Sequence, residues 1–159
     1  ETATGMTADS FAETFLFRPV GIKVYLWTAY PDGTMETEGG LALRPRDLAR
    51  IGQVFLQDGQ WNDAQVIPAD WVVEARKQRM TYSSGLGQKG YGYFWMESQL
   101  PYNETTTSSF FHFGDGGQLL MVIPELDMVI VFTGGSYGRF PTKLYEEIIH
   151  SYLLPAVNP

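Results

Sequence analysis

The stretch from Phe110 to Thr133, FFHFGDGGQLLMVIPELDMVIVFT, constrains the fold of this chain more than any other segment. Its two apolar runs, residues 118–123 and 128–133, flank a turn at residues 123–126, where Pro124 pre-sets the backbone angle that a tight turn needs. Two such runs predict an antiparallel hairpin. Because successive residues of the second run are apolar, we expect both faces of the hairpin to be covered, as in the middle of a sheet.

A cluster of glycines precedes the first strand of this hairpin. It reads Gly114-Asp115-Gly116-Gly117 and follows a short aromatic run, Phe110–Phe113. Glycine allows a sharp turn or a close approach of the backbone to another group. We therefore expect the functional part of the molecule to lie near this cluster.

The composition limits the classes of function. A chain of 159 residues with 44% hydrophobic residues suits one domain, residues 1–159, with a substantial core. A net charge of −7, with 11 basic residues and no basic cluster, argues against nucleic acid and anionic membrane surfaces as partners. The absence of cysteine excludes disulfides and thiol catalysis, and two distant histidines make a metal site improbable, so we expect no metal and no cofactor. The longest apolar run is interrupted by Pro124, Glu125 and Asp127, and no membrane span is predicted.

The remaining segments predict helices followed by strands and a final helix, which indicates an α+β fold with an antiparallel sheet of three or more strands packed against helices. Pro45 at a first helical position and Asp47 in the first turn are typical of a helix start. The helix periodicity places Phe11, Phe15, Trp71, Leu144 and Tyr152 among the inward-facing side chains. Helices are predicted over 8–17, 45–58, 69–79 and 141–153, a strand over 91–97, a strand or extended loop over 22–30, and loops over 34–43, 82–90, 101–108 and 134–140.

Several short motifs in this order resemble the C-terminal half of the serine β-lactamase and penicillin-binding-protein superfamily, in its class C β-lactamase and esterase-like branch. They are Thr4-Gly5-Met6-Thr7 with Phe17-Arg18-Pro19-Val20-Gly21, Glu38-Gly39-Gly40-Leu41 with Pro45-Arg46-Asp47-Leu48-Ala49, Gly59-Gln60-Trp61 with Ile67-Pro68-Ala69-Asp70-Trp71-Val72, Tyr91-Gly92-Tyr93-Phe94-Trp95, and Gly114-Asp115-Gly116-Gly117-Gln118 with Ile123-Pro124-Glu125-Leu126-Asp127. Each motif is weak alone, and together they extend along nearly the whole chain.

The resemblance implies a partial β-lactamase/transpeptidase-like fold whose N-terminal catalytic half is absent. The family's chemistry uses S-x-x-K, Y-x-N and a K-T-G-like strand motif, and none of these three occurs in this sequence. We therefore expect the nucleophilic serine to lie outside the chain, which would be inactive alone. The resemblance also implies a small ester, amide or β-lactam substrate and favours a periplasmic or secreted location.

By position, the third motif has a counterpart in His112-Phe113-Gly114. Acyl transfer needs backbone N–H groups aimed at the developing oxyanion, and the N–H of Asp115 is our candidate donor. A cationic or hydrogen-bonding His112 would polarise the site or hold a substrate carboxylate. His112 and Asp115 are thus the candidate catalytic residues, although structural roles in packing and in a turn are the alternatives. The candidate substrate-binding residues are Phe113, Gly114, Gly116 and Gly117.

Two further hypotheses remain open. Gly134-Gly135-Ser136-Tyr137-Gly138 matches the G-x-S-x-G nucleophile motif, but Pro141 places the next helix too late for a nucleophile elbow, and we favour a glycine-rich loop. The chain could instead be a non-catalytic binding or assembly module derived from the same fold. Since half a domain would leave an open sheet edge, we expect a homodimer through that edge.

Overall fold

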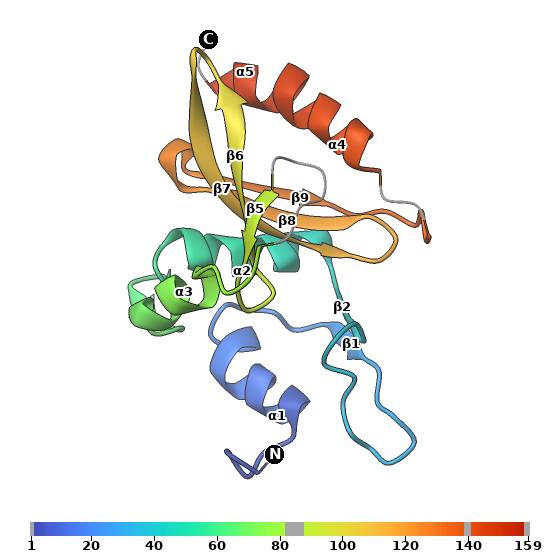
Figure 1. Ribbon diagram of the computed structural model, residues 1–159. Helices are drawn as coiled ribbons and strands as arrows, with labels where there is room; N and C mark the ends of the chain where they lie inside the picture. The colour runs from blue at the N-terminus through green and yellow to red at the C-terminus, as the bar shows by residue number, and fades with distance from the viewer. Residues whose placement is uncertain (1, 82–87, 139–140, 158–159) are drawn as a thin grey trace.

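The computed structural model describes residues 2–81, 88–138 and 141–157. Its central element is a five-stranded antiparallel sheet in which each strand pairs with the next one along the chain, in the order β5-β6-β7-β8-β9 (Figure 1). The strands are β5 Gln88–Tyr91, β6 Met96–Tyr102, β7 Thr105–Gly114, β8 Gln118–Ile123 and β9 Met128–Phe132. Two small hairpins, β1 Tyr25–Trp27 with β2 Leu41–Leu43 and β3 Gln60–Trp61 with β4 Ala64–Gln65, lie outside this sheet.

Helices precede and follow the sheet in the chain, and the two termini lie at opposite ends of the molecule (Figure 1). None of the helices in the described residues is both long and apolar enough to span a membrane. The helical segments are α1 Ala8–Ala12 with the π-helical turn η1 Glu13–Phe17, α2 Pro45–Leu56, α3 Ala69–Arg76, the 3-10 turn η2 Pro124–Leu126, and a C-terminal helix made of α4 Thr142–Ile148, η3 Ile149–Leu153 and α5 Leu154–Val157.

The hairpin predicted from the apolar runs is confirmed as β8 and β9, which pair from Leu119 with Phe132 to Ile123 with Met128. The expectation that both strands lie in the middle of a sheet is wrong for β9. β8 has a neighbour on each side, whereas β9 is the outer strand of the described sheet. Apolar residues on both faces of a strand indicate that helices or sheets pack above and below it. They do not indicate how many strands pair with it within the sheet.

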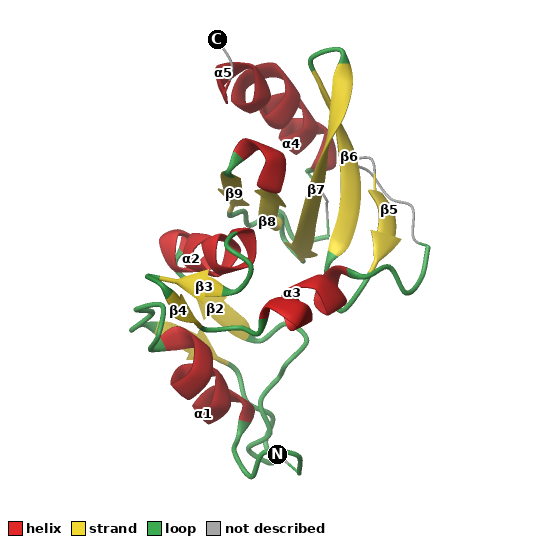
Figure 2. Cartoon of the chain, turned by 90° about the vertical axis from the view of Figure 1, so that its left-hand side faces the viewer, coloured by secondary structure: helices red, strands yellow, loops and turns green. Residues whose placement is uncertain are grey.

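Helices cover both faces of the sheet (Figure 2). On one face, Phe111, Leu119 and Met121 pack in a cluster with Tyr145 and Ile149 of the C-terminal helix. The opposite face packs against α2 and α3 through a second cluster of buried residues: Phe55, Val72, Ala75, Trp95, Phe110, Leu120 and Val122.

Helix α2 is the layer that joins the sheet to the N-terminal part of the chain. Its Gly52 allows close approach, since a Cβ there would lie 2.6 Å from Val129 Cγ1 and 2.7 Å from Leu120 Cδ1. On its other side, Val54 packs with Phe17 and other buried N-terminal residues. The helix predicted over 45–58 is thus confirmed, and it ends at Leu56.

The strand predicted over 91–97 and the loop predicted over 101–108 are both wrong. Residues 92–95 form the turn between β5 and β6, and β6 and β7 make a long hairpin whose turn contains Asn103 with a positive φ of 52°. The error over 101–108 comes from reading threonine and serine as loop residues, although threonine favours strands. In β7 they alternate, so that Thr107 and Ser109 are buried while Thr106 and Ser108 are exposed.

π-Helical turns explain why some predicted inward faces are wrong. A π turn bonds residue i+5 to residue i, as Arg18 N–H does to Glu13 C=O at 3.0 Å, and so shifts the helix face by one residue. In the C-terminal helix the shift buries Leu154, which is 3% exposed, and leaves Tyr152 64% exposed. The other predicted inward residues that are exposed are Phe11, Phe15, Trp71 and Leu144.

Four smaller predictions concern loops and helix ends. The third helix ends at Arg76, before the predicted end at residue 79. β2 was missed inside the loop predicted over 34–43, because a three-residue strand has no readable period. The loop predicted over 82–90 contains β5 from residue 88, and residues 82–87 lie outside the described residues. Residues 134–138 of the last predicted loop are a loop, and residues 139–140 also lie outside the described residues.

Candidate active site

The glycine cluster forms the turn between β7 and β8. Gly117 N–H donates to Gly114 C=O at 3.3 Å, and Gly116 and Gly117 have φ angles of 102° and 93°. Residues with side chains rarely adopt these angles, so the turn requires glycine at both positions. The sequence cluster is thus a conformational requirement of the hairpin.

The loop that follows β9, residues 134–138, packs on this turn. Ser136 N–H donates to Gly116 C=O at 2.8 Å, and Gln118 Nε2 donates to Gly134 C=O at 3.0 Å. The ring of Tyr137 covers Gly116, where a Cβ would lie 2.9 Å from the ring. The G-x-S-x-G segment is therefore a loop that packs on the turn, which confirms the favoured prediction of a glycine-rich loop over 134–138.

Tyr145 of α4 contacts the same turn through its hydroxyl group. Its hydroxyl donates to the buried C=O of Gly117, and its ring stacks on Phe132 with a centroid separation of 4.3 Å. Burial raises the pKa of the Tyr145 hydroxyl, so this group remains a hydrogen-bond donor at neutral pH. The turn thus receives hydrogen bonds from a loop and from a helix that are distant in sequence.

Asp115 occupies the exposed tip of the turn. The backbone bonds described above use groups of Gly114, Gly116 and Gly117. Asp115 is exposed to solvent, and a role for its backbone N–H in a site stays a prediction.

His112 lies two residues before the end of β7, opposite Leu120 of β8, and its side chain is half-buried. It shares a sheet face with Phe110, on the side of α2 and α3, and meets the ring of Trp95 edge-on at 5.6 Å. Burial lowers the pKa of His112 below its usual 6.5, because the charged imidazolium loses hydration. At neutral pH His112 is therefore a neutral imidazole, which disfavours the cationic role considered from the sequence.

Phe113 points to the opposite face of the sheet. It meets Phe111 edge-on at 5.2 Å and packs on the cluster beneath the C-terminal helix. The strand thus places the side chain of Phe113 away from that of His112. Any contact of Gly114, Gly116 and Gly117 with a substrate would be made by the backbone, and the ring of Phe113 is half-buried on the face opposite to His112.

Sequence reasoning missed Trp95 and Tyr145 as parts of this region. Trp95 is named in the sequence only as part of a motif, whereas in the structure it is buried and its ring lies edge-on to that of His112. Tyr145 lies within the helix predicted over 141–153, and that pattern does not assign it to the site. No local signal links Tyr145 to Gly117, 28 residues earlier, because the contact depends on how the helix packs on the sheet.

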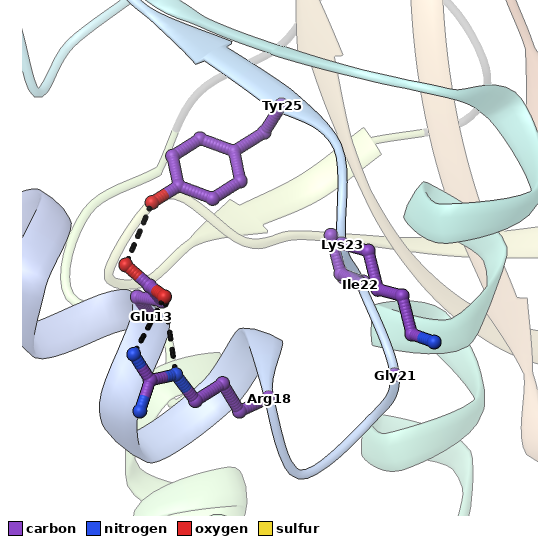
Figure 3. Close-up of a pocket in the computed structure, with 6 residues that line it drawn as sticks. All are labelled: Glu13, Arg18, Gly21, Ile22, Lys23 and Tyr25. Carbon is purple, nitrogen blue, oxygen red and sulfur yellow. Dashed lines mark hydrogen bonds and ion pairs between the residues drawn. The ribbon is translucent and has the colours of Figure 1, made fainter.

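Two cavities lie away from the glycine turn. One, of about 310 Å³, is lined by Glu13, Arg18, Gly21, Ile22, Lys23 and Tyr25 (Figure 3). There the Glu13 carboxylate accepts from Arg18 Nη2 at 2.9 Å and from the Tyr25 hydroxyl at 3.3 Å, so its charge is already compensated. The other, of about 370 Å³, lies beside α3 at Asp70, Trp71 and Glu74. Among the described residues, no group of three or more acidic or histidine side chains could hold a metal ion.

Comparison with known proteins agrees with the resemblance seen in the motifs. Residues 1–144 match the β-lactamase family, whereas no curated protein matches the chain. A Bacillus anthracis protein assigned as a 6-aminohexanoate-dimer hydrolase superposes with a TM-score of 0.70 and 21% identity, over 96% of this chain and 40% of its own.

Two further solved structures share the fold. The octameric penicillin-binding protein homologue from Pyrococcus abyssi gives a TM-score of 0.70 and 14% identity, over 94% of this chain and 38% of its own. A β-lactamase from Mycobacterium bovis gives 0.59 and 16%, over 97% of this chain and 55% of its own. The chain thus spans about half or less of the length of these proteins, and at these identities the likeness concerns the fold. Because the family match extends over residues 1–144, the chain belongs to the β-lactamase family.

Proposed function

We propose that this chain forms one wall of the active site of a serine hydrolase of β-lactamase, DD-peptidase or esterase type. The acyl-enzyme would form at a serine outside these 159 residues, because the sequence contains neither S-x-x-K nor Y-x-N. One observation carries the proposal. The turn at Gly114–Gly117 is held by Ser136 and Tyr145, and presents Asp115 at its tip next to the strand end that carries His112.

In this proposal the residues of the turn act through their backbone. The N–H of Asp115 donates to the oxyanion that develops on the substrate carbonyl, and the rigid turn keeps that donor in place before the reaction. The neutral imidazole of His112 donates or accepts a hydrogen bond at the substrate or its leaving group. Gly114, Gly116 and Gly117 allow the substrate to approach the main chain without steric conflict.

The test uses the protein that includes the serine-bearing segment. Asp115→Pro removes the backbone N–H, whereas Asp115→Ala removes only the carboxylate and is the matched control. We expect Asp115→Pro to reduce kcat for p-nitrophenyl acetate or nitrocefin by about 100- to 1,000-fold, the usual effect of losing one oxyanion donor, and Asp115→Ala to leave it nearly unchanged. Equal activity of the two variants, both folded by circular dichroism, would overturn the assignment of Asp115.

The 159-residue chain alone supplies a second measurement. We expect it to hydrolyse neither substrate above the level of a His112→Ala control. Turnover well above that control would contradict the proposal that the nucleophilic serine lies outside these residues.

A non-catalytic binding or assembly module is the second candidate. The outer position of β9 and the large exposed side chains of Leu26, Phe94 and Tyr137 favour this alternative. The two candidates differ in one observation, because only the hydrolase reacts covalently with a fluorophosphonate probe at a serine. Labelling of the serine-bearing protein, detected by mass spectrometry, would eliminate the module.

A further inference from the structure

An aromatic stack joins helix α3 to the turn between β5 and β6. The indole of Trp71 stacks on the ring of Tyr93, with a centroid separation of 5.5 Å and an interplanar angle of 18°. The guanidinium of Arg79 also lies over Tyr93, with Cζ 4.4 Å from the ring centroid, and it pairs with the carboxylate of Glu74. Because the backbone N–H of Tyr93 donates to Ala75 C=O at 2.8 Å, the turn that carries the stack is fixed to the helix.

The stack is held in place and yet remains accessible. Trp71 and Tyr93 are each 47% exposed, although both are large aromatic side chains. A ring that its neighbours already hold loses little conformational entropy when a ligand binds to it. The indole of Trp71 is therefore a preorganised surface for a ligand.

Trp71 also forms one wall of a cavity beside α3. The cavity has a volume of about 370 Å³, within the range of roughly 300–1,000 Å³ that is usual for small-molecule sites. Asp70 and Glu74 lie one helical turn apart, and Trp71 lies three positions before Glu74, so the helix brings the two carboxylates and the indole together. Pro68 completes the described lining, which contains no basic residue.

One of the two acids of this cavity has no ionic partner. Glu74 pairs with Lys77 at 3.8 Å and also with Arg79. Asp70 accepts the N–H of Trp71 at 2.9 Å through Oδ1, and none of the ion pairs between described residues involves Asp70. Asp70 thus supplies an unpaired negative charge to the wall of the cavity, on a chain whose net charge is −7. This charge favours a cationic ligand.

We propose that this cavity binds a quaternary ammonium group, of the kind found in choline. Indole is the aromatic ring that attracts cations best, and quaternary ammonium ions are typical ligands of such rings. A primary ammonium needs acceptors for three N–H groups, whereas the cavity offers the second carboxylate oxygen of Asp70 beside a Glu74 that is already paired. A quaternary ammonium donates no hydrogen bond and can lie against the indole of Trp71 and the ring of Pro68. This site goes beyond the hydrolase function proposed above and does not depend on it.

The first test is a titration of the 159-residue chain with three small probes, followed through the indole N–H resonance of Trp71. Choline is compared with 3,3-dimethyl-1-butanol, which has the same shape and no charge, and with ethanolamine, which has a primary ammonium. We expect choline to bind about tenfold more tightly than the neutral isostere, and also more tightly than ethanolamine. Added salt should weaken the binding of choline and leave that of the isostere unchanged.

Substitutions test the two parts of the site, with binding followed by saturation transfer to the methyl signals of choline and of its isostere. Trp71→Leu keeps an apolar side chain and should abolish the preference for choline. Tyr152→Leu is the matched control, because it removes an exposed ring from the C-terminal helix. Asp70→Asn removes the charge and keeps an acceptor for the N–H of Trp71, so it should lower the affinity for choline severalfold without affecting the isostere.

Equal affinity for choline and its isostere, tighter binding of ethanolamine, or a preference that survives in Trp71→Leu would overturn the proposal. If Trp71→Leu does not fold, the comparison of the three probes on the unmodified chain decides the question. Phosphatidylcholine vesicles then distinguish the source of the group in a chain that binds choline. Co-sedimentation with the vesicles would assign the site to a lipid headgroup, and its absence would assign the site to a soluble quaternary ammonium compound.

Discussion

At the scale of single residues, the helices that cover one face of the sheet determine the protonation of His112. The imidazole lies beside Trp95 and under α2 and α3, and the resulting loss of hydration lowers its pKa below 6.5. We expect an NMR titration to give a midpoint below 6.5, with the resonance assigned by its loss in a His112→Gln variant. A midpoint at or above 6.5 would contradict the burial of this side chain.

The same shift predicts a stability effect of definite sign. The unfolded chain takes up a proton at His112 near pH 6.5, whereas the folded chain does so only at lower pH. The free energy of unfolding therefore falls as the pH decreases from 6.5 towards the folded pKa, and above 6.5 this group contributes no pH dependence. Urea unfolding between pH 7 and 5 should show a smaller loss in His112→Phe than in the unmodified chain.

Tyr145 contributes to stability through one buried hydrogen bond. Tyr145→Phe keeps the ring stacked on Phe132 but leaves the buried C=O of Gly117 without this donor, so the free energy of unfolding should fall by about 1–3 kcal/mol. Tyr152→Phe removes an exposed hydroxyl from the same C-terminal helix and should change it by less than about 0.5 kcal/mol. Equal effects in the two variants, measured by urea unfolding, would show that the bond to Gly117 is absent in solution.

At the scale of elements, the turn between β5 and β6 holds a phenylalanine in the left-handed backbone region, whereas the other described non-glycine residues with a positive φ are Asp or Asn. Phe94 has a φ of 62° and is 68% exposed, although the left-handed region costs a residue with a side chain roughly 1–2 kcal/mol. Such strain persists only where the surrounding bonds determine it. Here Gly92 N–H donates to Trp95 C=O at 2.7 Å and Tyr93 N–H donates to Ala75 C=O at 2.8 Å.

Two substitutions of Phe94 distinguish the free-energy cost of the strained backbone from the contribution of the aromatic ring. Phe94→Ala removes the ring and keeps the Cβ, whereas Phe94→Gly removes both. The glycine variant should be the more stable by about 0.5–1 kcal/mol, because relief of the strain exceeds the added entropy of the unfolded glycine. An alanine variant of equal or greater stability in urea would mean that residue 94 has a negative φ in solution.

The elements also show what the sequence could and could not predict. α2 and the β8–β9 hairpin were predicted because their apolar patterns are strong and local. The hairpin of β6 and β7 was missed, because β7 begins with a run of threonine and serine over residues 105–109. The outer position of β9 was missed because it depends on which strands lie beside it in the sheet. A motif singled out His112 and the glycine turn as candidates, but the contact of Tyr145 with Gly117 arises from packing of distant elements, which no local pattern encodes.

At the scale of the whole molecule, the position of β9 at the outer edge of the described sheet predicts how copies of the chain associate. Both faces of β9 are covered, by α2 and by the C-terminal helix, yet in the described sheet β8 is its one strand neighbour. An unpaired edge presents a row of N–H and C=O groups that can template pairing with another chain. A second copy could pair there about a two-fold axis, which joins like edges in antiparallel orientation.

We therefore expect the purified chain to associate reversibly through β9. The net charge of −7 opposes the approach of two copies, and since salt screens exposed charges over about 8 Å at physiological ionic strength, association should strengthen as salt is added. Sedimentation velocity over a wide concentration range should show a salt-dependent dimer. Hydrogen exchange should slow with concentration in 128–132, while β6, inside the sheet, serves as the control. A single monomeric species that melts cooperatively at every concentration, with unchanged exchange in β9, would refute pairing at this edge and require that β9 be stable without a second strand neighbour.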